Sequence, residues 1–263
     1  MPSAWAIAWP RQSPECKMFT MKSLLRIVLL SVLLHASILA TLRAPEYRTY
    51  FTLDEMPDLT ECLPAPPDTT GMDFAYDVTR YFWGKAQRTD PERAALAVRD
   101  ATWSIDSVIT LFSEPFGYPI TKEETPELYK LMYEGIATVE LIRVRPKAHY
   151  MRRRPFVRFH EGTLTPWEEA ELSGEGSYPS GHTIRGWCAA TLLTEINPAA
   201  AERLFARAWT YGESRVIVGA HWQSDVDASR LAADIGCAYL RSSREFLFQM
   251  ARAKEEFARV YGR

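Results

Sequence analysis

The chain has 263 residues, of which 47% are hydrophobic and 24% are charged, as is usual for a globular protein with one sizeable core. Its formal net charge of −2 argues against a nucleic-acid-binding protein, because such proteins usually carry a strongly basic surface. The basic residues are instead concentrated locally, between residues 143 and 158.

The amino-terminal region has the pattern of an export signal. A short basic start at residues 21–26 precedes an apolar run over residues 27–40, and small alanines lie at and before residue 44. We therefore expect residues 21–44 to be a signal peptide and the mature protein to be exported, either periplasmic or secreted, with an uncleaved anchor as the alternative. No other segment approaches the roughly 18 consecutive apolar residues of a membrane span, so none is expected in the mature domain.

The rest of the chain divides by composition. Residues 1–20 resemble neither a signal nor a domain, and we expect them to be a non-structural upstream segment. Residues 45–70 are rich in proline and predict an extended lead-in, and residues 71–263 predict one helical domain. The chain has no internal repeat and no convincing alternating strand, so we expect an all-α, single-domain helical bundle whose active site is formed by helix ends and connecting loops.

Helix starts and stops can be placed along this domain. Asp90-Pro91 is a cap followed by proline at the first helical position, and the apolar residues of 94–108 then recur at helical spacing. The Pro-Phe-Gly-Tyr-Pro stretch at 115–119 ends that helix. Further helices are expected to begin at Pro126, near Pro198 and near Phe246, the last with an apolar face that continues to residue 260.

The cysteines do not suggest a metal site or a disulfide framework. Removal of the signal would leave Cys62, Cys188 and Cys237, an odd number, so at least one thiol stays unpaired. Cys188 and Cys237 lie in apolar helical contexts, where a buried, inert cysteine is the common outcome. No Cys or His cluster has the spacing of metal ligands.

The first of three fragments with chemical potential is a basic run that ends in proline. Lys147 and Arg154 are seven residues apart, close to two helical turns, so both could point the same way. Pro155 is expected to end the helix there. Arginine suits bidentate phosphate contacts and lysine provides a point charge. Arg152 and Arg153 are expected either to be solvated or to draw an anionic substrate inward.

The second fragment is Pro-Ser-Gly-His-Thr at residues 179–183. Ser180 is a good helix cap, and Gly181 lets a ligand approach the backbone amides of the helix amino terminus, where phosphate binds favourably. His182 lies within one turn of that spot and could protonate a leaving oxygen. The alternative is a capped helix with a buried structural histidine.

The third fragment follows Arg215. Gly219 is expected to interrupt the helix that carries Arg215, and the next helix is expected to begin around His221. Within that helix His221 and Asp225 would share a face, so that the carboxylate could orient the imidazole as a nucleophile or base. The alternative is a surface pair that contributes only about 0.2–0.5 kcal/mol to the helix.

The order and spacing of the three fragments resemble a known signature. Lys-x6-Arg-Pro, Pro-Ser-Gly-His and Ser-Arg-x5-His-x3-Asp are similar to the signature of the superfamily of type 2 phosphatidic acid phosphatases and vanadium haloperoxidases. Phe-Gly-Tyr-Pro-Ile-Thr at 116–121, Gly-Ser-Tyr-Pro-Ser-Gly-His-Thr at 176–183 and His-Trp-Gln-Ser-Asp-Val-Asp-Ala at 221–228 resemble one branch, the bacterial class A nonspecific acid phosphatases. The similarity covers roughly residues 62–258.

This resemblance implies a role for each position of the signature. His221 would attack phosphorus and form a phosphohistidine, Asp225 would orient it, and His182 would protonate the leaving alcohol and later activate water. The residues implied to hold the phosphate oxygens are Lys147, Arg154, Ser180, Gly181 and Arg215. Neither a metal nor another cofactor is implied. The expected ligands are small phosphomonoesters, with inorganic phosphate or vanadate as competitors, and relatives imply a homo-oligomer.

Two features depart from the family pattern. Pro146 precedes the lysine, so the helix that carries it is expected to be broken or restarted there. Residues 160–173 contain no cysteine, so a family disulfide cannot be assumed. The competing hypotheses are a vanadium-dependent haloperoxidase, a membrane-associated lipid phosphatase and a phosphate-binding protein without turnover.

Overall fold

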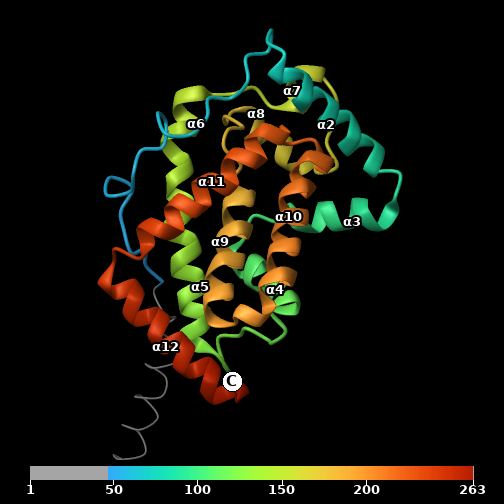
Figure 1. Ribbon diagram of the computed structural model, residues 1–263. Coiled ribbons are helices and arrows are strands. Elements are labelled where there is room, and N and C mark those ends of the chain that lie inside the picture. The colour runs from blue at the N-terminus through green and yellow to red at the C-terminus, as the bar shows by residue number, and fades with distance from the viewer. Residues whose placement is uncertain (1–46, 263) are drawn as a thin grey trace, which may run out of the picture. The chain divides into compact units, whose positions relative to one another are not determined.

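The computed structural model describes residues 47–262, and every regular element in that range is a helix (Figure 1). The α-helices are α2 (Asp73–Gln87), α3 (Pro91–Asp100), α4 (Ile105–Phe116), α5 (Pro126–Val139), α6 (Val144–Tyr150), α7 (Pro155–Phe159), α8 (Glu169–Ser173), α9 (Gly181–Ile196), α10 (Ala201–Val218), α11 (Gln223–Leu240) and α12 (Arg244–Tyr261). Short 3₁₀ helices are η1 (Glu140–Arg143), η2 (Pro166–Glu168) and η3 (Pro198–Ala200). The all-α prediction is confirmed. The predicted upstream segment (1–20) and signal peptide (21–44) lie outside the described residues.

Helix α9 forms the centre of the bundle. It packs against α4, α5, α10 and α11, and most of its residues are buried on all sides of the helix. A helix that is apolar all round belongs in a core, which explains why α9 shows no clear amphipathic pattern. Gly186 permits the close approach of α10, because a Cβ atom there would lie 2.5 Å from the Tyr211 ring. The start of α9 is therefore held firmly inside the protein.

The prediction of one helix over residues 91–114 is wrong. The chain leaves helical geometry after Ala101, and Ser104 caps a new helix by accepting a hydrogen bond from the Ser107 amide at 3.4 Å. A serine cap offers the backbone an alternative to continuing the first helix, and apolar spacing does not reveal it. The second helix ends as predicted, at Gly117, whose φ of 91° is left-handed. The break places Trp103 beside the start of α9.

The basic segment is also not one helix. Helix α6 follows the 3₁₀ turn η1 and ends at Tyr150, because Met151 adopts a left-handed conformation with φ of 38°. The expected restart near Pro146 is therefore found. Pro155 begins α7 instead of ending a helix, and Arg154 is the residue that precedes it. Lys147 thus reaches the common site from α6, and Arg154 reaches it from the residue before α7.

The lead-in from residue 47 packs along α5 and α6. The Tyr50 amide donates to Thr138 on α5 at 2.9 Å, and the Tyr150 hydroxyl donates to the Thr60 carbonyl at 3.0 Å. Cys188 and Cys237 are buried free thiols, as expected, and Cys62 is an exposed free thiol. Within residues 47–262, no helix combines the length and the apolar character needed to cross a membrane.

Candidate active site

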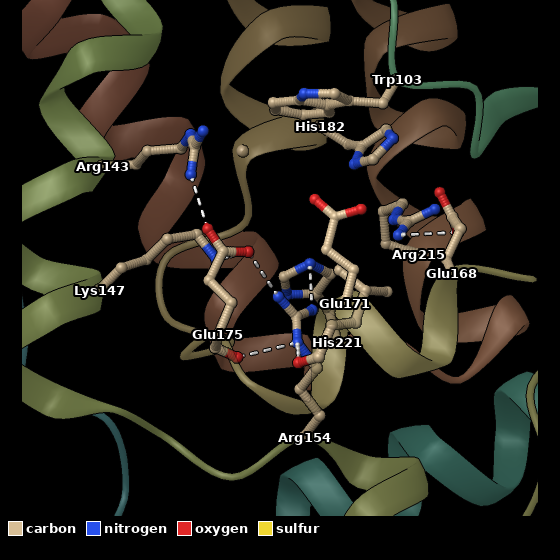
Figure 2. A pocket seen from close by; sticks show the side chains of 12 residues that line it. Trp103, Arg143, Lys147, Arg154, Glu168, Glu171, Glu175, His182, Arg215 and His221 are labelled. Carbon is tan, nitrogen blue, oxygen red and sulfur yellow. Dashed lines mark hydrogen bonds and ion pairs between the residues drawn. The ribbon is translucent and has the colours of Figure 1, made fainter.

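A cavity of about 100 Å³ opens where α9 begins. Figure 2 shows its lining side chains, which come from segments far apart in the sequence. The predicted site residues that line it are Lys147, Arg154, Gly181, His182, Arg215 and His221. The other two predicted residues, Ser180 and Asp225, are buried but do not line the cavity. The structure therefore brings the three sequence fragments together.

His221 is oriented by Asp225. Its Nδ1 lies 3.3 Å from Asp225 Oδ2, and its Nε2 lies 3.1 Å from Nη1 of Arg154. A guanidinium can only donate, so Nε2 is the unprotonated nitrogen and Nδ1 carries the hydrogen that the carboxylate accepts. The electron pair of Nε2, which accepts from Arg154, is thus on the edge of the imidazole away from Asp225.

The prediction that His221 and Asp225 lie in the same helix is wrong. Helix α11 begins at Gln223, so His221 lies before the helix and Asp225 lies in its first turn. Asp225 Oδ2 also accepts the Trp222 amide at 2.9 Å, which caps the helix. The carboxylate therefore fixes the helix start and the histidine together.

Burial and nearby cations keep His221 neutral. Burial lowers the pKa of His221 well below its usual value, and the positive charges of Arg154, Lys147 and Arg215 lower it further. An uncharged imidazole is the form that can act as a nucleophile.

In Figure 2, His182 lies above His221, beside Trp103. Its Nε2 donates to the Ala101 carbonyl at 2.9 Å, which leaves Nδ1 as the nitrogen that can exchange a proton. The Trp103 ring lies beside it, with ring centroids 4.8 Å apart. Burial, followed by the charge of Arg215, lowers the pKa of His182 well below its usual value. The carbonyl and the indole both come from the break between α3 and α4.

Arg215 is a buried cation without hydrogen bonds. Its side chain is 0% exposed, and its nearest carboxylate oxygen, on Glu168, is 3.8 Å away. None of its three guanidinium nitrogens has a hydrogen-bond partner. Burial lowers its pKa, yet an arginine remains charged at neutral pH. Such a group is costly unless an anion binds it, so the cavity has the character of an anion site.

Lys147 and Arg154 supply the other buried cations. Burial and the neighbouring Arg154 lower the pKa of Lys147 to about 7, and its Nζ donates to the Gly176 carbonyl at 2.5 Å. Burial also lowers the pKa of Arg154, to about 10. Arg154 is fixed by the Leu172 carbonyl at 2.8 Å and the Ala220 carbonyl at 3.0 Å. Backbone carbonyls thus hold both side chains in place.

The start of α9 has the expected cap. Ser180 Oγ accepts a hydrogen bond from the Thr183 amide at 3.4 Å, and the Ser180 amide donates to Ser229 at 2.7 Å. The first amides of the helix have no carbonyl four residues earlier to bind, so they are available at its end. A Cβ atom on Gly181 would lie 2.9 Å from Arg143, so a larger residue would crowd the cavity wall.

Several lining residues were not predicted from the sequence. They are Trp103, Arg143, Glu168, Glu171, Leu172 and Glu175. The expectation that Arg152 is solvated or attracts substrate is wrong, because it forms a buried ion pair with Asp225 at 2.5 Å and with Asp77 at 2.7 Å. Only the fold brings Asp77 to this place, since it lies 75 residues earlier in the chain.

Comparisons with known proteins agree with this geometry. The model of the PAP2 superfamily matches residues 129–245. The chain is 42% identical to a non-specific acid phosphatase of Providencia stuartii over 204 residues, which cover 77% of this chain and 82% of that protein. It is 39% identical to a non-specific acid phosphatase of Salmonella typhimurium (74% and 78% covered) and 32% identical to an acid phosphatase of Zymomonas mobilis (74% of each). The chain therefore belongs to the PAP2 superfamily, among the bacterial class A nonspecific acid phosphatases.

Proposed function

We propose that this protein is an acid phosphatase that hydrolyses small phosphomonoesters without a metal ion, through a phosphohistidine on His221. The observation that carries the proposal is the buried guanidinium of Arg215, which forms no hydrogen bond and has its ion-pair partner Glu168 3.8 Å away, in a cavity that also holds an oriented, neutral histidine. A phosphoryl group can accept hydrogen bonds from the Arg215 guanidinium, and the His221 imidazole can attack its phosphorus.

The cations of the cavity account for phosphate binding in this proposal. Arg215, Lys147 and Arg154 face the equatorial oxygens of the phosphoryl group, together with the first amides of α9. Preorganised cations stabilise the charge of a phosphoryl transition state, a role that Mg²⁺ has in other enzymes. The side chains of this chain therefore supply charge that a metal supplies elsewhere.

The reaction has two displacements at phosphorus. Nε2 of His221 attacks, the bond from phosphorus to the alcohol oxygen breaks, and the alcohol oxygen takes a proton from Nδ1 of His182. Water then attacks the phosphohistidine, His182 takes a proton from that water, and the P–N bond breaks to release inorganic phosphate and neutral His221. Asp225 supports the positive charge that the imidazole gains in the first displacement and loses in the second.

The protonation state of His182 links the proposal to acidic conditions. In the free protein the pKa of His182 is lowered by burial and by Arg215. A bound phosphoryl anion opposes that positive charge and favours the protonated imidazole. We therefore expect His182 to be protonated with substrate bound, and more fully so at acidic pH.

The setting of the activity is proposed from the sequence pattern and the family. We propose export to the periplasm or the medium, with residues 21–44 as the signal, a homo-oligomeric assembly, and inorganic phosphate and vanadate as competing ligands.

An assay of the purified mature domain with p-nitrophenyl phosphate tests the function. We expect turnover that persists in EDTA and is inhibited by vanadate. Loss of turnover in EDTA that a divalent metal restores would contradict the metal-independent mechanism. Bromide oxidation by the vanadate-loaded protein, or phosphate binding without turnover, would favour the haloperoxidase or the binding protein instead.

A further inference from the structure

The carboxylate of Glu175 lies among cations of the proposed phosphate site. One of its oxygens, Oε2, is 3.1 Å from Nη2 of Arg154 and 3.4 Å from Nζ of Lys147. Its other oxygen is 2.9 Å from Nη1 of Arg143. Figure 2 shows the carboxylate between these side chains, on the cavity side. The side chain of Glu175 is 43% exposed, whereas those of Lys147 and Arg154 are 6% and 1% exposed.

Arg154 has little capacity left for a second anion while Glu175 is in place. Its Nε donates to the Leu172 and Glu175 carbonyls, and its Nη1 faces the Ala220 carbonyl and Nε2 of His221. Its Nη2 donates to the Glu175 carboxylate and to the Gly176 carbonyl. Backbone carbonyls and a buried histidine cannot move away easily, but a partly exposed carboxylate can. A phosphate oxygen therefore reaches Arg154 by displacing Glu175.

Arg215 differs from Arg154 in this respect. Its guanidinium nitrogens form no hydrogen bond, and its ion-pair partner Glu168 stays 3.8 Å away. An entering phosphate can therefore bind Arg215 before it competes for Arg154 and Lys147. The phosphate site therefore has two parts: Arg215, which is available, and Arg154 with Lys147, which are occupied by Glu175.

We propose that Glu175 is a resident anion that occupies Arg154 and Lys147 between turnovers, leaves when the phosphoryl group binds, and returns as inorganic phosphate departs. This inference rests on the proposed phosphate site. It makes Glu175 an affinity-determining residue that weakens product inhibition, because the returning carboxylate replaces the contacts that phosphate gives up.

The charge of Glu175 suits this role. Burial raises the pKa of Glu175, but Lys147, Arg143 and Arg154 outweigh burial and lower it below its usual value. The carboxylate therefore stays ionised at mildly acidic pH, and the competition persists under the conditions in which an acid phosphatase works.

A purely structural role makes the opposite prediction. If Glu175 only orients Lys147 and Arg154 for phosphate, its neutralisation weakens phosphate binding. If Glu175 competes with phosphate, its neutralisation strengthens binding. The sign of the change in phosphate affinity separates the two roles.

The test is calorimetric titration of inorganic phosphate into wild type, Glu175→Gln and Glu171→Gln. The control removes the same charge from the same cavity, but Glu171 forms no ion pair with Arg154 or Lys147 among the contacts of residues 47–262. We expect the Kd for phosphate to fall about tenfold in Glu175→Gln and clearly less in Glu171→Gln. Glu175→Asn, whose side chain is too short to reach both cations, is expected to behave like Glu175→Gln and serves if that variant folds poorly.

An unchanged or higher Kd in the Glu175 variants, or an equal gain in the Glu171 variant, would overturn the inference. So would a wild type that does not bind phosphate. Titration needs no turnover, so a protein that binds phosphate but hydrolyses no ester would contradict the proposed function while the test of Glu175 remains decisive. In an active enzyme, the inhibition constant for phosphate should fall in parallel with the Kd.

Discussion

Arg152 donates to Asp225 at 2.5 Å, in an ion pair in which the aspartate side chain is 0% exposed. The other oxygen of that aspartate lies 3.3 Å from Nδ1 of His221. Asp77 holds the same arginine at 2.7 Å and accepts the Ser224 amide at 2.8 Å. The imidazole is therefore oriented by a chain of buried charges, each of which has a partner.

This arrangement predicts the effect of removing the charge of Asp225. Asp225→Asn should lower kcat by at least about a hundredfold, because a neutral amide supports neither the Nδ1–H tautomer nor the charge that develops on His221. The control is Asp227→Asn, since Asp227 is 44% exposed and pairs with Arg230. Steady-state kinetics of both variants provide the measurement. A loss in kcat that is similar in the two variants would show that Asp225 does not orient the nucleophile.

Arg215 should contribute to function without contributing to stability. Arg215→Met should lower kcat/KM by about a hundredfold or more, since a charge-assisted hydrogen bond contributes about 1.5–3 kcal/mol and several are lost. The Tm of the free variant should be equal to or above that of wild type, because the wild-type guanidinium of Arg215 is buried without hydrogen bonds. Phosphate should raise the Tm of wild type but not of the variant.

Arg203→Met is the control for that experiment, because Arg203 lies on the same helix but is exposed. Its activity and its response to phosphate should match wild type. A large drop in the Tm of free Arg215→Met would show that Arg215 is instead a structural residue.

The proposed acid can be tested by the choice of leaving group. His182→Ala should impair alkyl phosphates strongly and p-nitrophenyl phosphate less, because nitrophenolate leaves without much protonation. The measurement is the ratio of kcat/KM for the two substrates in wild type and variant. Equal losses would mean that His182 positions phosphate or supports the fold, and that the acid lies elsewhere.

The lowered pKa of Lys147 predicts weaker phosphate binding above neutrality. Below a pH of about 7 the amine is charged in the free protein, and above it the amine loses its proton and its attraction for phosphate. The Kd for phosphate should therefore rise with pH from about 7, and Lys147→Arg should move that rise to higher pH. Titrations between pH 5 and 9 provide the check, and an identical pH profile in the two proteins would exclude Lys147 as its source.

The lowered pKa of Lys147 also makes the stability of the fold depend on pH. The unfolded chain binds this proton up to the usual lysine value of 10.5, and the folded chain binds it only up to about 7. The contribution of Lys147 to the free energy of unfolding therefore rises with pH between these values, in the absence of phosphate.

The site was predictable from the sequence to the extent that it depends on spacing within fragments. Lys147, Arg154, His182, Arg215 and His221 all reach one cavity, because each fragment is a helix end and the fold gathers these ends. The helix boundaries next to these residues were not all predictable. The left-handed conformation of Met151 and the start of α11 after His221 depend on tertiary packing.

The residues that were missed share a different property. Glu175 and Asp77 act through contacts with parts of the chain that are distant in sequence, and neither lies in a spacing pattern with its partners. Local patterns carry no information about such long-range pairs.

The break at Ala101 was missed for another reason: it is set by the Ser104 cap, which interrupts an otherwise regular apolar spacing.

The central claim is that His221 is the nucleophile, and trapping of the phosphorylated protein tests it most directly. Wild type and His221→Ala are mixed with substrate, quenched rapidly and digested, and the phosphopeptides are identified by mass spectrometry under conditions that preserve phosphohistidine. We predict a phosphate on His221 in wild type, no phosphopeptide in the variant, and residual activity below about a hundredth of wild type, because a covalent route cannot proceed without its nucleophile. Phosphate on a different residue, or substantial turnover by His221→Ala, would contradict the mechanism.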